Sequence, residues 1–141
     1  MRRVVITGLG IVSSIGNNSS EVLASLKAGK SGITFNEDMA EHGFRSQIAG
    51  AVDLDVKEHV DKRTLRFMGP GAAYAHIAMG QAIADAGLTE SDVINPMTGV
   101  IAGSGGPSTS AMLAAHQTVL KTGATKRVGP FAVPKTMSST V

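Results

Sequence analysis

Two glycine-rich turns are the first candidates for chemistry in this chain. The run VVITGLGIVSSIGN, residues 4–17, places Gly8 and Gly10 directly after four strand-like residues. Such a turn opens a dinucleotide site when a third glycine and an acidic residue about 20 positions later complete it. Ser13 stands at the third glycine position. No clear second strand precedes the acidic residues that come next, which are Glu21, Glu37 and Asp38. The pattern therefore disfavours a dinucleotide, and we expect no cofactor.

The second glycine turn is GSGGPS, residues 103–108. It lacks the lysine and the spacing of a P-loop, so it does not predict a phosphate site. Two interpretations stay open for Gly103, Gly105 and Gly106. They are turn positions that need a positive φ, or positions where a missing side chain leaves space for a ligand beside the backbone.

The other potentially catalytic side chains form no constellation. The four histidines do not have the spacing of metal ligands: His42, His59, His76 and His116. No GxSxG elbow is present. The chain also has no cysteine, which removes thiolate chemistry and is compatible with a reducing cytoplasm. We therefore predict no metal site and no catalytic residue within these 141 residues.

Composition limits the class of protein. A chain of 141 residues, 43% hydrophobic and 17% charged, fits one globular domain. The net charge of +2 gives no support for a nucleic-acid or membrane-surface partner. No run of about 18 apolar residues occurs, so we predict no membrane span. The interrupted N-terminal apolar run lacks the pattern of a signal peptide.

Strands and helices alternate along the chain. Strands are predicted at 3–7 and 100–102, with short extended pieces at 44–48 in an otherwise irregular stretch from 31 to 55. Helices are predicted from about 18 to Gly29, over 57–68, from Pro70 to Gly87 and over 108–121. The segment TESD, residues 89–92, has the spacing of a capping box.

This alternation predicts an α/β layered fold. Two strands do not make a stable sheet, so something that completes it is expected. The missing strands lie either within residues 31–55 or in a chain that continues past Val141.

Five sequence blocks stand in order along the chain, from its start to its end: RRVVITGLGIVSSIGN, DKRTLRFMG, AIADAGL, GVIAGSGG and KRVGPFAVPKTMSST. Together they resemble the N-terminal part of the bacterial β-ketoacyl-acyl-carrier-protein synthases, closest to type I. The resemblance implies a thiolase-like αβαβα fold with its sheet incomplete here, and residues 1–141 as the first part of the synthase N-terminal domain. It also implies that the opening glycine turn is structural.

The resemblance implies a cytoplasmic, homodimeric enzyme of type II fatty-acid biosynthesis. Such an enzyme decarboxylates malonyl-carrier protein and condenses the carbanion with an acyl group held as an enzyme thioester. The family's nucleophilic cysteine, two histidines and lysine would lie beyond Val141, so this stretch alone is expected to be inactive. Two alternatives remain: a non-catalytic fragment that binds carrier protein or dimerises, and a nicotinamide-dependent reductase.

The resemblance also assigns binding roles to particular residues. Gly106 matches the gate of the acyl pocket, and Thr136 and Met137 match residues that line the partner's pocket across the dimer interface. An ordinary core position is the alternative for Met137. A docking face for the acidic acyl carrier protein is implied at Lys62, Arg63, Arg66, Lys126 and Arg127. The alternative is a merely solvated basic surface, and Ala124 departs from the family's basic pattern.

Overall fold

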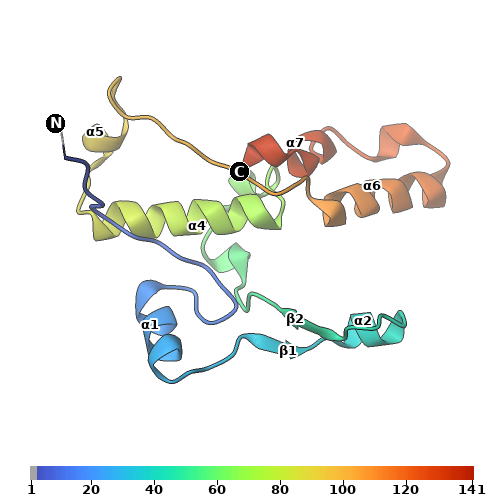
Figure 1. Cartoon of the computed structure of the whole chain (residues 1–141). Coiled ribbons are helices and arrows are strands. Elements are labelled where there is room, and N and C mark those ends of the chain that lie inside the picture. The colour runs from blue at the N-terminus through green and yellow to red at the C-terminus, as the bar shows by residue number, and fades with distance from the viewer. Residues whose placement is uncertain (1–2) are drawn as a thin grey trace. The chain divides into compact units, whose positions relative to one another are not determined.

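The computed structural model describes residues 3–141 and divides into two compact units. Unit 1 comprises the described residues up to Leu54 together with Ala78–Leu88. Unit 2 comprises Asp55–Ile77 and Thr89–Val141. Helix α4 (Pro70–Asp85) contributes residues to both units (Figure 1). Arg2, which belongs to the first sequence block, lies outside the described residues.

Unit 1 begins with an extended segment that leads to helix α1 (Ser19–Lys27). The helix was predicted, and it starts where the Asn18 side chain accepts a hydrogen bond from the Glu21 amide. It stops before Gly29, whose φ of +63° suits a residue without a side chain.

A short hairpin follows α1 in unit 1. Strands β1 (Ile33–Phe35) and β2 (Ile48–Gly50) pair antiparallel with Phe35 opposite Ile48, and helix α2 (Glu37–Glu41) lies between them in sequence. Residues 31–55 therefore do contain strands, as one of the two interpretations held. The predicted extended piece at 44–48 is displaced toward 48–50.

Unit 2 begins with two short helical turns where one helix over 57–68 was predicted. That prediction is wrong: a 3₁₀ turn, Val56–Glu58, is followed by helix α3 (Lys62–Leu65). Asp61 separates them because its backbone is extended, with φ −60° and ψ 146°, and its carboxylate accepts hydrogen bonds from the Arg63 and Thr64 amides. A cap in the middle of a predicted helix starts a new helix.

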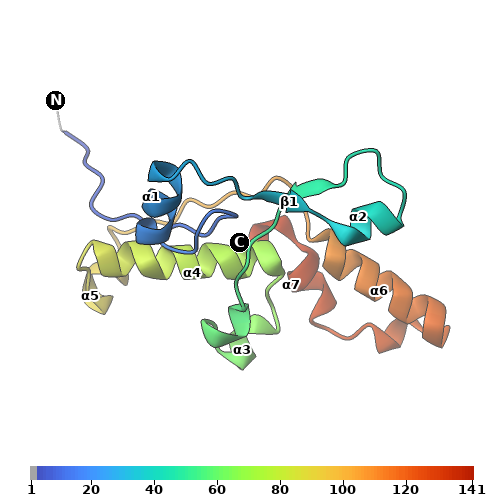
Figure 2. The same ribbon diagram turned by 90° about the horizontal axis from the view of Figure 1, so that it is seen from below.

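Three of the remaining elements of unit 2 match predicted helical segments: the N-terminal part of α4, α5 (Glu90–Val93) with the predicted capping box, and α6 (Thr109–Thr122). Three others were not predicted: a 3₁₀ turn Thr125–Arg127, α7 (Ala132–Thr136) and a 3₁₀ turn Ser138–Thr140. Helix α7 lies beside the start of α6 in both views (Figures 1 and 2).

The two strands predicted at 3–7 and 100–102 do not form. Both segments are extended but pair with no other strand among the described residues, and their side chains are open, with Val4 96% and Ile101 fully exposed. The buried side chains belong to helices and the turn before α3: Val22, Ser25, Val60, Ala72, Ala73 and Ile77. No helix of the described residues has the length and apolar character that a membrane span requires.

Candidate functional site

The first glycine turn, in unit 1, packs against the C-terminal half of α4. A Cβ atom on Gly8 would overlap the carbonyl oxygen of Ala82, and one on Gly10 would overlap that of Ala78. Only glycine therefore allows the two backbones to approach this closely.

Two amides of this turn are already engaged. Leu9 N donates to the Asp85 carboxylate at 2.9 Å, and Ile11 N donates to Gln81 Oε1 at 3.0 Å. A phosphate held by a Gly-x-Gly turn needs such backbone donors free. These contacts support the structural interpretation of the turn over the dinucleotide interpretation.

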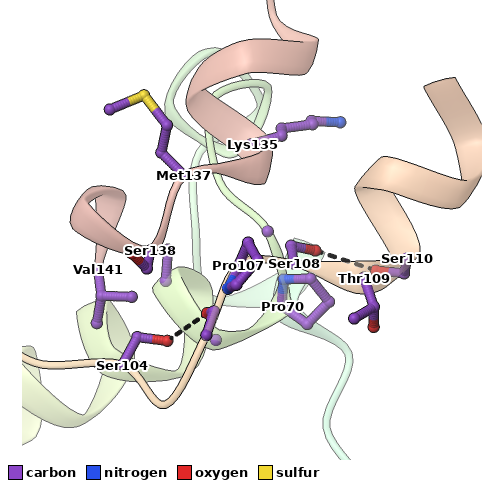
Figure 3. Close-up of a pocket in the computed structure, with 14 residues that line it drawn as sticks. Pro70, Ser104, Pro107, Ser108, Thr109, Ser110, Lys135, Met137, Ser138 and Val141 are labelled. Atoms are coloured by element: carbon purple, nitrogen blue, oxygen red, sulfur yellow. Dashed lines mark hydrogen bonds between the residues drawn. The ribbon is translucent and has the colours of Figure 1, made fainter.

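The second glycine turn borders a cavity of about 230 Å³ within unit 2. Gly106, predicted to gate the acyl pocket, and Met137, predicted to line the pocket of a partner subunit, both line this cavity of one chain. Ser104, Pro107 and Lys135 also line it. Figure 3 shows the pocket residues on the segment around Pro107 and on the segment from Lys135 to Val141, with Pro70 drawn beside Ser108. The structure thus brings together two residues 31 positions apart, the difference between 137 and 106.

Local contacts fix the two walls of this pocket. Ser108 accepts a hydrogen bond from the Ala111 amide, which caps α6, and its own amide donates to the Thr136 carbonyl at 3.0 Å. Gly69 lies in the same corner, where a Cβ atom would stand 2.9 Å from the Lys135 carbonyl oxygen. The start of α6, the end of α7 and the turn before α4 are therefore held together at the pocket.

The three glycines of the second turn do not have positive φ. The interpretation that required positive φ at these positions is wrong. A Cβ atom built on Gly103, Gly105 or Gly106 would meet no atom within 4 Å. Open space beside Gly106, which lines the pocket, agrees with the interpretation that the missing side chain leaves room for a ligand.

Thr136 does not line this cavity. Its hydroxyl donates to the Ala132 carbonyl at 2.7 Å, and its carbonyl accepts from Ser108. Within the described chain Thr136 therefore stabilises the α7 segment, while Met137, half exposed, borders the pocket. Sequence reasoning missed Ser104, whose hydroxyl donates to the Gly106 carbonyl at 2.8 Å, and Lys135, which projects away from Met137 (Figure 3).

The predicted docking residues are all exposed in unit 2. Lys62 and Arg63 open α3 and Arg66 follows it, whereas Lys126 and Arg127 lie in the 3₁₀ turn after α6. Their exposure fits both a docking face and a solvated surface.

Asp61 anchors the start of α3. A hydrogen bond from the Thr64 hydroxyl, followed by one from the Arg63 amide, lowers the pKa of the Asp61 carboxyl below its usual range. Asp61, the acidic residue next to Lys62 in the sequence, therefore caps the helix that carries Lys62 and Arg63.

Arg66 contacts an aromatic pair. Its guanidinium carbon lies 5.4 Å from the centre of the Phe131 ring. The Phe67 ring meets Phe131 edge to face, at 5.0 Å between centres and 89° between planes. Basic and aromatic side chains from two segments therefore form one cluster at the start of α7.

The described residues contain no group of three or more His, Asp or Glu side chains able to hold a metal ion.

Known proteins resemble this chain throughout its length. The 3-oxoacyl-[acyl-carrier-protein] synthase 1 of Haemophilus influenzae is 52% identical over 141 residues, and that of Escherichia coli K12 is 49% identical over 142. The matches cover the whole chain but 35% of each relative, so the chain spans about a third of their length.

Solved structures match in the same way. The ishigamide ketosynthase/chain length factor superposes with a TM-score of 0.83 at 30% identity, over 96% of this chain and 34% of that one. A β-ketoacyl synthase from Burkholderia phymatum superposes with a TM-score of 0.78 at 30% identity, over 98% of this chain and 34% of that one. The α/β thiolase-like fold class predicted from the sequence is confirmed. Because the family model for the β-ketoacyl synthase N-terminal domain matches residues 1–141, the chain belongs to the β-ketoacyl synthase family.

Proposed function

We propose that the protein containing this chain is a 3-oxoacyl-acyl-carrier-protein synthase of fatty-acid biosynthesis. Loss of CO₂ from malonyl-carrier protein leaves a carbanion, which attacks the carbonyl carbon of an acyl-enzyme thioester. The new carbon–carbon bond forms as the enzyme thiolate leaves. The match of the whole chain to such synthases, at about half identity, supports this reaction class.

The observation that carries the proposal is the pocket shared by Gly106 and Met137. Its volume of about 230 Å³ is below the roughly 300–1,000 Å³ of sites that enclose a whole small molecule, so it suits one part of a substrate. The flexible thioether of Met137 packs against alkyl chains of varied shape, and the open space beside Gly106 admits the chain.

The reacting thiol comes from outside these 141 residues in this proposal. The chain has no cysteine. What the chain itself contributes in this proposal is a wall for the acyl group, formed by Gly106 and Met137 within one copy. We therefore expect this stretch alone to show no condensing activity.

An acidic acyl carrier protein is the proposed macromolecular partner. The exposed basic side chains of α3 and of the turn Thr125–Arg127 would attract its acidic surface and orient the encounter. Such an attraction acts mainly on association and weakens with salt.

The experiment uses the complete protein with acyl and malonyl carrier proteins and identifies the products by mass spectrometry. We expect 3-oxoacyl-carrier protein in the native enzyme and a shift toward shorter acyl primers in Gly106→Met, because the new side chain fills the open space. Gly103→Met is the matched control, since Gly103 has equal space but does not line the pocket. Absence of condensation would refute the reaction, and an unaltered chain-length profile would refute the role of Gly106.

A further inference from the structure

Phe131 lies at the junction of two features that the proposed function treats separately. On one side its ring faces the guanidinium of Arg66, at 5.4 Å from ring centre to carbon. On the other it is the residue from which α7 starts, and α7 leads directly to Met137 at the pocket.

The Phe131 ring is held in place by its neighbours. Phe67 packs edge to face against it, and the Phe131 carbonyl accepts the amide of Lys135 at 3.2 Å in the first turn of α7. The Met137 amide in turn donates to the Val133 carbonyl at 3.1 Å. These backbone hydrogen bonds hold Phe131 and Met137 at the two ends of the same short helix.

Within the described chain the ring nevertheless remains partly exposed, since the exposed fraction is 37% for Phe131 and 44% for Phe67. If this phenylalanine pair were buried, hydrophobic packing alone would explain it. An exposed pair beneath an arginine restrains a long side chain that would otherwise sample many rotamers, because the planar guanidinium is attracted to the ring face. Restraint in the free protein lowers the ordering cost of binding.

We propose that Phe131 is a positioning residue for carrier-protein docking. Its ring holds the Arg66 guanidinium in place for an acidic group of the carrier. Phe131 also immediately precedes α7, the helix that leads to the pocket. The inference rests on the proposed docking face and goes beyond it, because Phe131 carries no charge and would not be chosen by charge pattern.

The test measures carrier binding and turnover on the complete protein. The probe is the acyl carrier protein loaded with one saturated acyl group, and its Kd is measured by calorimetry at low salt. KM and kcat are measured with this carrier substrate and with the corresponding acyl-pantetheine, which lacks the carrier protein.

We expect Phe131→Leu to raise Kd and KM for the carrier substrate about two- to fivefold, the range of an exposed cation–π contact. The kcat value and the KM for acyl-pantetheine should stay unchanged. Phe131→Tyr keeps an aromatic face and should retain native affinity. Phe44→Leu is the matched control, because Phe44 is an exposed phenylalanine of unit 1, and it should have no effect.

A second set of variants tests the contact without altering the aromatic pair. Arg66→Lys keeps the charge but loses the planar group. It should weaken carrier binding in the native background and have little further effect in the Phe131→Leu background. Independent, additive losses would overturn the inference.

The outcomes separate the inference from the docking proposal. Unchanged carrier affinity in Arg66→Ala would remove Arg66 from the docking face and would overturn the inference, whereas charge reversal of all five basic residues without effect would refute the docking face itself. A loss in Arg66→Ala with native affinity in Phe131→Leu would overturn the inference alone. Equal losses for carrier and acyl-pantetheine in Phe131→Leu would show a purely structural role and would also overturn it.

Discussion

Gly10→Ala should destabilise the protein strongly, because this glycine sits against a helix backbone. The added methyl group would overlap the Ala78 carbonyl oxygen and stand 2.7 Å from the Ala78 carbonyl carbon and 2.9 Å from the Ala82 amide nitrogen. Real Cβ atoms essentially never approach other atoms closer than 3.0 Å. Backbone atoms cannot rotate away, so the turn and α4 must separate.

The cost has two parts. Overpacking of this kind costs about 1–3 kcal/mol. Separation also weakens the hydrogen bond from the Ile11 amide to Gln81 Oε1, now 3.0 Å, and an unsatisfied group costs about 1–3 kcal/mol more. The expected loss of unfolding free energy is therefore about 2–6 kcal/mol, a large share of the roughly 5–15 kcal/mol typical of native proteins.

Gly80→Ala is the matched control. Gly80 lies in the interior of the same helix, and a Cβ atom there meets nothing within 4 Å. Alanine is a better helix former than glycine, so this variant should gain about 0.5–1 kcal/mol. Urea unfolding of the complete proteins, followed by circular dichroism, gives both values. If Gly10→Ala unfolded within about 0.5 kcal/mol of the native protein, the close approach of turn and helix would be refuted.

Three further predictions concern other contacts. Gln81→Leu should lower the unfolding free energy by about 1–3 kcal/mol, because it removes the side chain that bridges two backbone groups; urea unfolding measures this. Asp61→Asn keeps an N-cap but loses the carboxylate whose pKa is lowered by folding. The charge contribution is present at neutral pH and lost as pH falls below about 4, so the thermal midpoints of native and variant proteins should converge there. Lys126→Glu with Arg127→Glu should raise KM for the carrier substrate and flatten its salt dependence, whereas unchanged kinetics would exclude this cluster from docking.

The long helices were predictable because their signals are local. Asn18 and Ser108 cap α1 and α6 with their side chains, and Gly87 follows α4 with a φ of +65°. Each signal acts through residues within one turn, so neighbouring sequence is sufficient to place the helix ends. The same local chemistry explains the error at 57–68, where Asp61 caps a new helix although the hydrophobic pattern continues across it.

The candidate pocket was only partly predictable. Gly106 and Met137 were named from family resemblance, and the structure places both at one cavity. No local pattern identifies Ser104 or Lys135, because their place at the pocket depends on how the end of α7 meets the start of α6. Phe131 likewise carries no signal in sequence, since its contact with Arg66 joins segments 65 positions apart, the difference between 131 and 66.

The segments 3–7 and 100–102 show that residue pattern alone does not decide whether a predicted strand forms. Their β-branched runs are typical of strands buried on both faces, yet Val4 is 96% and Ile6 88% exposed. A helix forms its backbone hydrogen bonds within itself, whereas a strand needs a neighbouring strand for them. A strand buried on both faces also needs neighbours that cover its side chains, and burial of each large apolar side chain contributes about 1.5–3 kcal/mol. The described residues supply no such ladder for either segment. The only ladder formed joins β1 to β2 within the described chain, because a hairpin brings its own partner 13 residues later, the difference between 48 and 35. Sequence pattern therefore identifies strand candidates, and the availability of a pairing strand decides which of them form.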